Sequence, residues 1–114
     1  MSLYANYVKE RTGQDCLETD HYFITYSIQP DVNNVSFIFI HDFYIKPEKR
    51  RGYLARRICT SILQLGKESN CKYALSQIDC TTNNATSALK FQLSMGGVIL
   101  SAANNLITMC LTLE

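Results

Sequence analysis

The chain has 114 residues, 46% hydrophobic and 18% charged, which suits one folded domain with its own core and excludes a disordered tail. Its 11 Lys and Arg residues nearly balance its 10 Asp and Glu residues, for a net charge of +1. That balance argues against a broadly basic nucleic-acid coat protein and against an acidic solvating segment.

The composition also limits where the chain is expected to work. No apolar run reaches the roughly 18 residues that a membrane-spanning helix needs, and the first residues lack the basic and then apolar pattern of a signal peptide. The 5 cysteines are odd in number and form no C-x-x-C or Cys/His zinc spacing. We therefore expect free thiols, no metal site, a cytoplasmic location and no membrane partner.

The first half of the chain predicts one helix followed by three strands. Helical spacing over residues 3–11 ends before Gly13. Residues 16–18 and 22–28 are expected to be strands, the second rich in β-branched and aromatic residues. A turn at 30–34 leads to a long strand at 35–45, so apolar that we expect it at the buried centre of a sheet, and Pro47 ends it.

The second half predicts two helices and three more strands. A helix with apolar residues at helical spacing over 54–65 is expected to stop at Gly66 in the C′ position. A strand at 73–79, N-cap candidates at 81–84 and a helix at 85–95 follow, and strands at 98–100 and 106–113 form a hairpin. The fold class is therefore α/β (α+β), with a parallel strand pair in the middle of the chain and antiparallel pairs around it.

Half of the positive charge lies in one short stretch. Residues 46–57 hold six cations and one acid, whereas residues 1–45 hold two cations and six acids. Because this stretch joins a buried strand to a helix, Arg50, Arg51 and Gly52 are placed to wrap a phosphate or pyrophosphate at the helix N-terminus. The alternative is a solvated basic face, which is what a run of charge usually means.

Three segments, in order, resemble the GNAT family of N-acetyltransferases. Residues 41–48 (HDFYIKPE) resemble its fourth-strand pattern, residues 50–55 (RRGYLA) its pyrophosphate loop, and residues 84–97 (NATSALKFQLSMGG) the helix that follows. The resemblance implies a mixed, mostly antiparallel sheet with a central parallel pair and flanking helices. It also implies a single domain over residues 1–114 that lacks the family's usual first strand and first helix.

The resemblance further implies acetyl-CoA as cofactor and assigns residues to it. The backbone of Phe43, Tyr44 and Ile45 would pair with the pantetheine arm, and Asn84 would contact the same arm. The pyrophosphate would lie on the loop and helix start formed by Arg50, Arg51, Gly52, Tyr53, Leu54 and Ala55.

The resemblance also leaves catalytic roles to assign. Asp42 is the candidate general base, and a structural or solvent-facing acid is an equal alternative for it. His41, as its neighbour on a strand, is expected to face the opposite side of the sheet. Gln92 or Phe91 stands where the family often has a tyrosine, so no general acid is identified.

The leading function is transfer of an acetyl group from acetyl-CoA to a primary amine, on a small molecule or a protein. The alternative is a degenerate CoA-binding regulatory or interaction module, which Tyr53 and Gln92 favour. A nucleic-acid-binding domain is a third, weaker hypothesis because the net charge is only +1. Covalent catalysis at Cys80 is a minor fourth, and a homodimer over an uncovered sheet edge is a further hypothesis.

Overall fold

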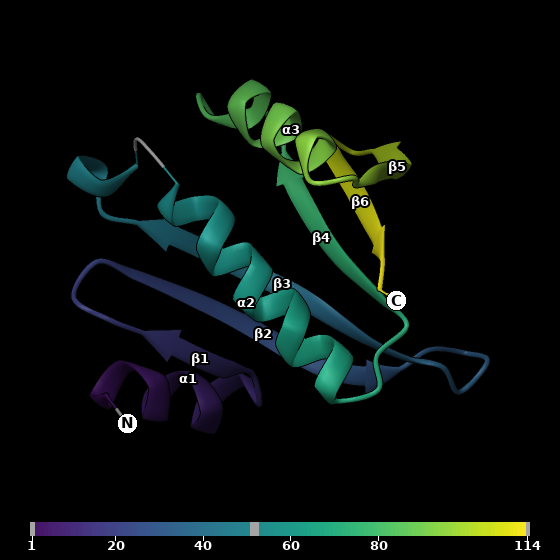
Figure 1. The fold of residues 1–114 in the computed structure, drawn as a ribbon, viewed down its shortest axis with the longest axis horizontal. Helices are drawn as coiled ribbons and strands as arrows, with labels where there is room; N and C mark the ends of the chain where they lie inside the picture. The colour runs from purple at the N-terminus through teal and green to yellow at the C-terminus, as the bar shows by residue number, and fades with distance from the viewer. Residues whose placement is uncertain (1, 51–52, 114) are drawn as a thin grey trace.

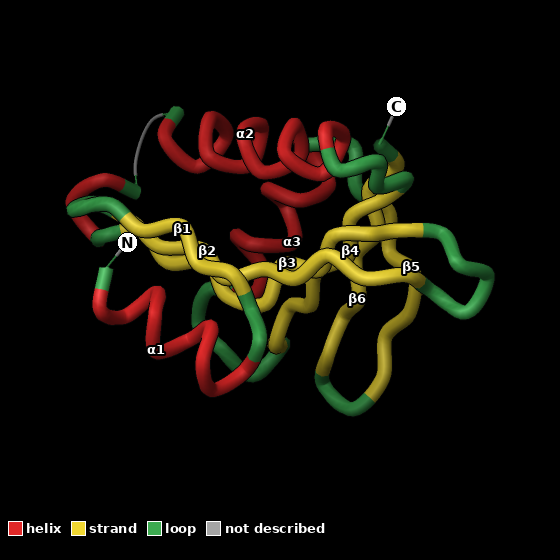
Figure 2. Tube along the Cα trace, turned by 90° about the horizontal axis from the view of Figure 1, so that it is seen from below, coloured by secondary structure: helices red, strands yellow, loops and turns green. Residues whose placement is uncertain are grey.

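The computed structural model describes residues 2–50 and 53–113, and in them one six-stranded sheet separates two helical layers (Figures 1 and 2). Helix α1 (Leu3–Thr12) lies on one face. Helices α2 (Leu54–Glu68) and α3 (Ala85–Ser94) lie on the other. The strand order is β1-β2-β3-β4-β6-β5, with the bounds β1 Asp15–Glu18, β2 Tyr22–Pro30, β3 Ser36–Ile45, β4 Tyr73–Asp79, β5 Val98–Ala103 and β6 Leu106–Thr112.

The pairing confirms the predicted mixed sheet. Strands β3 and β4 are parallel and joined by α2, whereas the pairs β1–β2, β2–β3, β4–β6 and β5–β6 are antiparallel. The core lies between the sheet and α2, where Ile24, Ile38 and Ile62 are 0–1% exposed. The apolar stripe of α2 is buried against this face, and this burial holds β3 and β4 against the same helix.

The strand at residues 36–45 is only half buried, which contradicts the predicted buried centre. Ile38 is fully buried, but His41, Asp42 and Tyr44 are exposed. The apolar letters of this strand therefore do not report one uniform environment. The physical reason is that β4 accompanies β3 over only part of its length, as described below.

Gly66 lies inside α2 and not at its C′ position, so that prediction is wrong. A Cβ on Gly66 would come within 3.1 Å of Leu113 Cδ1 and 3.2 Å of Ile38 Cγ2, so a glycine here lets the helix approach the sheet closely. The helix continues to Glu68, and Asn70 (φ 64°) takes the left-handed conformation that follows its end.

Two of the predicted turns have backbone conformations that explain their residues. Gly13 (φ 76°) ends α1 and donates its backbone N–H to Lys9 O, 3.0 Å away. Asn104 (φ 54°) and Asn105 (φ 65°) form the two-residue turn between β5 and β6, a pair of positive φ angles typical of tight hairpins. Helix α1 ends before Gly13 as predicted, whereas β5 continues to Ala103, beyond the predicted residue 100; each of the two turns needs a residue that tolerates positive φ.

No helix in the described residues combines the length and the apolarity that crossing a membrane would require.

One hydrogen-bonded carboxylate fixes the β2–β3 turn to the neighbouring strand. Asp31 Oδ1 accepts the backbone N–H groups of Asn33 (2.8 Å) and Val35 (2.9 Å), and Oδ2 accepts the hydroxyl of Tyr73 (2.8 Å). These bonds to the ionised form lower the pKa of Asp31, with the backbone bond from Val35 the largest cause. The same contact, after burial, raises the pKa of Tyr73 to about 12.

Replacing Tyr73 with Phe is expected to lower the free energy of unfolding, relative to the wild type, by more at pH 7 than at pH 3. Because the folded-state pKa of Asp31 is depressed, its contribution to stability is present above the unfolded pKa and disappears as pH falls. The Tyr73→Phe loss should therefore shrink on acidification. Urea unfolding of both proteins between pH 3 and pH 7 measures it, and a loss that stays constant over that range would contradict the role given to Asp31.

Candidate active site

Strands β3 and β4 separate halfway along their length. The parallel pairing runs from Phe37 and Tyr73 to Ile40 and Ser76 and stops there. Both strands continue, β3 to Ile45 and β4 to Asp79. Past Ile40, one edge of β3 has no strand beside it in the described part of the chain, so backbone N–H and C=O groups on that edge are available to a ligand.

A β-bulge at His41 lies where the two strands part. Tyr26 pairs with Ile40 and Thr25 pairs with Asp42, so His41 is an extra residue on β3. Asp42 is held at the bulge because its backbone N–H donates to Thr25 Oγ1 (3.0 Å). A bulge bends its strand and increases the local twist, which accounts for β3 turning away from β4 at this point.

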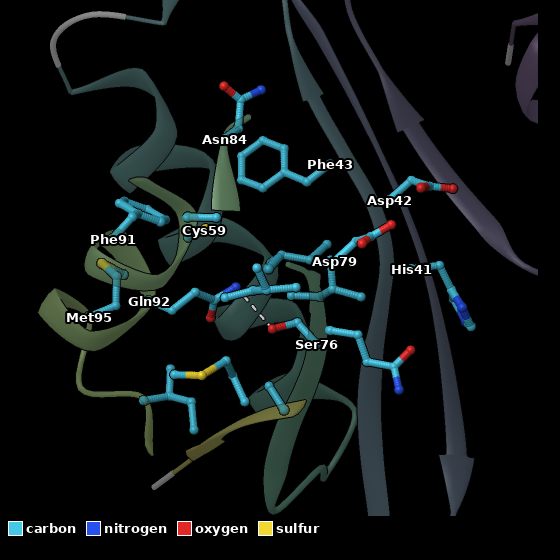
Figure 3. Close-up of a pocket in the computed structure, with 18 of the residues that line it drawn as sticks. His41, Asp42, Phe43, Cys59, Ser76, Asp79, Asn84, Phe91, Gln92 and Met95 are labelled. Carbon is cyan, nitrogen blue, oxygen red and sulfur yellow. Dashed lines mark hydrogen bonds between the residues drawn. The ribbon is translucent and has the colours of Figure 1, made fainter. Parts of the chain in front are cut away.

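The bulge corrects the predicted facing of His41 and Asp42. The ring of His41 lies 4.7 Å from that of Phe39, so the two share a face. Tyr44 stacks on Phe23 (5.6 Å), which contacts Tyr4 of α1, and Asp42 is two residues before Tyr44 on the same strand. His41 and Asp42 therefore both lie on the α1 face. Figure 3 shows both side chains directed away from Phe91, Gln92 and Met95.

The opening leads to a cleft of about 340 Å³ that lies mainly on the opposite face, and His41 and Asp42 also line it. It lies between α2, α3 and the separated strands (Figure 3). Phe43 and Asn84 lie at its upper end, and Cys59 of α2 and Phe91 and Met95 of α3 form its apolar wall. The cleft thus offers an apolar channel beside the free edge of β3.

A polar bridge crosses the cleft. Gln92 Nε2 donates to Ser76 Oγ across 2.9 Å. This bond joins α3 to the last residue of β4 that pairs with β3. The backbone behind Gln92 is fixed as well, because Gly97 N donates to Gln92 O (3.0 Å) and a Cβ on Gly97 would meet that oxygen at 2.9 Å. The side-chain amide of Gln92 is therefore held in place.

The cysteine in the cleft is chemically quiet. Burial raises the pKa of the Cys59 thiol to about 11, despite the opposing effect of Arg56. At neutral pH the thiol stays protonated and is a poor nucleophile. Cys80, the minor covalent candidate, lies exposed just after β4, where its backbone N–H donates to Asn105 O.

The cationic stretch after β3 begins with a one-turn helix. This 3-10 helix spans Pro47–Lys49 and leads to Arg50. Arg50 Nε donates to Ile45 O (2.8 Å), and its guanidinium lies over the Tyr44 ring, 5.4 Å from the centroid. Arg50 is therefore folded back on the end of β3, with its guanidinium against Tyr44 on the α1 face.

The other predicted cofactor residues lie around the same end of the sheet. Ile45 is buried, and Tyr53 occupies the N-cap position of α2 with 79% of its surface exposed. Leu54 and Ala55 begin α2 and are half-buried. Asn84 is the N-cap residue of α3, although its side chain makes no capping bond. Arg51 and Gly52 lie outside the described residues.

The α1 face beside the opening carries acids and aromatic rings. Glu18 pairs with Phe23 and Phe23 with Tyr44, so the three form one row across the sheet. Tyr4 packs on Phe23, and its pKa is raised by burial first and then by neighbouring groups that include Asp42 and Glu18. The α1 face beside the opening therefore carries the acids Asp42 and Glu18, and the Arg50 guanidinium lies over Tyr44 on the same face.

Sequence reasoning did not identify most of the cleft wall. Cys59, Ser76 and Met109 come from three different elements, and nothing in their sequence context marks them. The contribution of α3 could have been found, because Ala88, Phe91, Gln92 and Met95 recur at the spacing of one helix face and all line the cleft.

Comparison with solved structures identifies the architecture. The NatC complex bound to Gag peptide and CoA matches with a TM-score of 0.71 at 15% identity, over 82% of this chain and 61% of that one. A GNAT-family acetyltransferase from Listeria monocytogenes matches with a TM-score of 0.67 at 11% identity, over 88% of this chain and 64% of that one. The chain has the GNAT fold.

A bacterial toxin also matches, with a TM-score of 0.73 at 10% identity, over 97% of this chain and 74% of that one. No protein-family model matches the sequence, and no curated protein matches it. The chain spans just over 60% of the length of the NatC and Listeria chains. At these identities the likeness concerns the GNAT fold, and the chemistry must be argued from this chain's own residues.

Proposed function

We propose that the protein is an acetyl-CoA-dependent N-acetyltransferase that acts on a primary amine. The observation that carries this proposal is the opening between β3 and β4, whose cleft has apolar walls from α2 and α3 and is also lined by the ionisable His41 and Asp42. An enzyme that transfers an acetyl group from a thioester to an amine must bring both groups to one point, and they can approach it from different directions. The NatC neighbour, which binds CoA and a peptide, supports the same assignment.

The residues on the α2 side fit the cofactor. The free edge of β3 at Phe43–Ile45 can pair with the amide groups of a pantetheine arm as an added strand would. The cleft of about 340 Å³ offers that arm apolar walls from Cys59 and Phe91. The start of α2 has unpaired backbone N–H groups that suit a pyrophosphate, and Arg50, anchored at the end of β3, adds positive charge shortly before that helix in the chain.

Acetyl-CoA supplies the activated acetyl group in this proposal, and the chain's own residues supply position and proton transfer. A primary ammonium has a pKa of about 10, so it must lose a proton before it can attack at neutral pH. In this proposal the amine arrives on the α1 face. Asp42 lies there and remains a candidate general base, and the backbone N–H groups on the free edge of β3 are available to stabilise developing negative charge.

A second candidate function is cofactor binding without robust transfer. The observation that favours it is the amide of Gln92, which donates to Ser76 Oγ, because neither Gln92 nor Phe91, the two residues that could stand where the family often has a tyrosine, is an acid. An amide does not protonate a departing thiolate. Under this hypothesis the protein would bind acetyl-CoA and serve as a regulatory or interaction module.

One experiment separates the two functions. Purified protein is incubated with acetyl-CoA and, separately, spermidine, free lysine, a lysine-containing peptide and a peptide with a free N-terminus. Release of the CoA thiol and gain of one acetyl group by the amine, followed by mass spectrometry, are expected for at least one acceptor. Stabilisation by acetyl-CoA with no transfer to any of these amines would select the binding module and reject the enzyme.

Replacing Arg50 with Ala is expected to weaken acetyl-CoA binding about tenfold or more. A charge-assisted hydrogen bond contributes about 1.5–3 kcal/mol, and 1.4 kcal/mol corresponds to a factor of ten. Arg11→Ala is a matched control, because Arg11 also lies over a tyrosine ring (Tyr7, 5.7 Å) but belongs to α1. Titration calorimetry at low and high salt measures both variants. Equal affinities for the wild type and Arg50→Ala would remove Arg50 from the phosphate site.

A further inference from the structure

The side chain of His41 is held on the α1 face at the point where β3 and β4 part. It is the extra residue of the bulge, and the last β3–β4 pair, Ile40 with Ser76, immediately precedes it. Its ring lies against Phe39, with centroids 4.7 Å apart, and its Nε2 lies 2.8 Å from Ser27 Oγ. An imidazole fixed on two sides, yet exposed, is placed to meet a molecule that approaches the opening.

The hydrogen bond to Ser27 leaves one ring nitrogen for chemistry. Ser27 Oγ also accepts a bond from Gln29 Nε2 (3.2 Å), and a hydroxyl oxygen has two acceptor positions. When His41 Nε2–H donates to Ser27, Nδ1 carries the lone pair. In the described residues Nδ1 has no hydrogen-bond partner. That nitrogen is therefore free to accept a proton from an incoming group.

We propose that His41 Nδ1 is the proton acceptor for the amine substrate, with Ser27 as its positioning residue. This inference rests on the proposed acetyltransferase function. The ammonium gives one proton to His41, and the amine nitrogen then forms the new C–N bond while the C–S bond of the thioester breaks. The nitrogen loses its second proton to the departing thiolate, and His41 returns its proton to water, so atoms and charge balance.

The electrostatic surroundings suit this role better for His41 than for Asp42. Partial burial lowers the pKa of His41, and Asp42 beside it opposes the shift. The lowered pKa favours the neutral imidazole, which is the form that can accept a proton. A base with a pKa near the working pH transfers a proton most efficiently, and histidine is the side chain whose ordinary pKa lies there. Asp42 instead provides a negative charge that stabilises the imidazolium.

Groups from each neighbouring element belong to this proton-transfer environment. Strand β2 presents the uncharged Ser27 and Gln29. Across the opening, Asp79 of β4 is exposed, as is Gln77 two residues before it on the same face. Helix α1 contributes Tyr4, and β1 contributes Glu18 further along the sheet. The anions among them favour protonated His41, so they support transfer of a proton to it and do not hinder it.

The test compares variants with and without a base at position 41. His41→Gln keeps an amide nitrogen that can bond Ser27 and cannot accept a proton. The substrate is an amine from the panel above that the wild type acetylates. With it, we expect His41→Gln to lower kcat about 100-fold or more. The acid limb of the wild-type pH profile should disappear, and stabilisation by acetyl-CoA should not change. Ser27→Ala is expected to lower kcat roughly two- to tenfold and to keep the limb. His21→Gln, at the exposed turn before β2, is the matched control.

A second measurement does not depend on turnover. The chain has only 2 histidines, so an NMR titration of the wild type, assigned with the His41→Gln spectrum, gives the His41 pKa directly. A value below about 6.5 is expected, and one above 7 would overturn the assignment. Wild-type kcat in His41→Gln, or loss of the acid limb only in Asp42→Asn, would reject His41 while leaving acetyl transfer intact. Cofactor binding with no transfer by the wild type would reject both.

Discussion

Replacing Ala88 with Phe is expected to abolish the stabilisation of the protein by acetyl-CoA. In the wild type, a ligand at 100 times its Kd adds about 2.7 kcal/mol to the free energy of unfolding. For a domain of this size that corresponds to a rise in Tm on the order of 10 °C. Ala88 is half-buried on α3 and lines the cleft, so a phenyl ring there would enter the space between α3, Phe43 and Cys59.

The neighbouring residue provides the control. Ser87 is exposed on α3 and does not line the cleft, so Ser87→Phe adds the same ring without filling the channel. Differential scanning fluorimetry at several acetyl-CoA concentrations compares the two variants with the wild type. An undiminished shift in Ala88→Phe would place the cofactor elsewhere, and no shift in the wild type at millimolar acetyl-CoA would count against cofactor binding altogether.

The elements of this fold were predictable because their signals are local. The stripe of Leu54, Ile58 and Ile62 predicts α2, and the β-branched and aromatic run of residues 22–28 predicts β2. Both signals arise from burial of one face of one segment. The end of α2 was not predictable in the same way. Gly66 lacks a side chain because Ile38 of β3 and Leu113, just after β6, leave little room for a Cβ there, and both are distant in the sequence.

The facing of the site residues was lost at the bulge. Strict alternation places His41 and Asp42 on opposite faces, and one unpaired residue puts both on the α1 face. Whether β3 contains that extra residue depends on its register with Thr25 and Tyr26, which precede His41 by 16 and 15 positions. The sequence pattern of β3 alone does not determine its register with β2. The pattern did assign the ionisable residues to the correct strand.

Arg50 illustrates a second limit of sequence reasoning. Its position between a strand and a helix predicts a phosphate ligand, and its side chain is instead anchored to Ile45 O and the Tyr44 ring. These contacts do not exclude an anion, because Nε and the ring face use only part of the guanidinium. They do tie the cationic loop to the strand that forms the free edge of the opening. The loop and the cleft are consequently parts of one structure.

Replacing Ile38 with Ala is expected to lower the free energy of unfolding by about 2–5 kcal/mol, the usual cost of an Ile-to-Ala cavity. Ile38 is 0% exposed and packs with Ile24, Ile62 and the helix at Gly66. For a domain of this size the loss corresponds to a fall in Tm of about 8–20 °C. Ile38→Val should cost about 0.5–1.5 kcal/mol, and Val32→Ala, at a 100% exposed position, less than about 0.5 kcal/mol.

The same variant also tests whether the core and the opening are separable. Ile38 lies in the paired half of β3, and the opening begins after Ile40. If the cleft is independent of the packing below it, acetyl-CoA at 100 times its Kd should return about 2.7 kcal/mol to Ile38→Ala, as it does to the wild type. Urea unfolding with and without acetyl-CoA measures both quantities. A variant that unfolds in one transition but gains nothing from acetyl-CoA would show that Ile38 holds the two strands at the angle that binding requires.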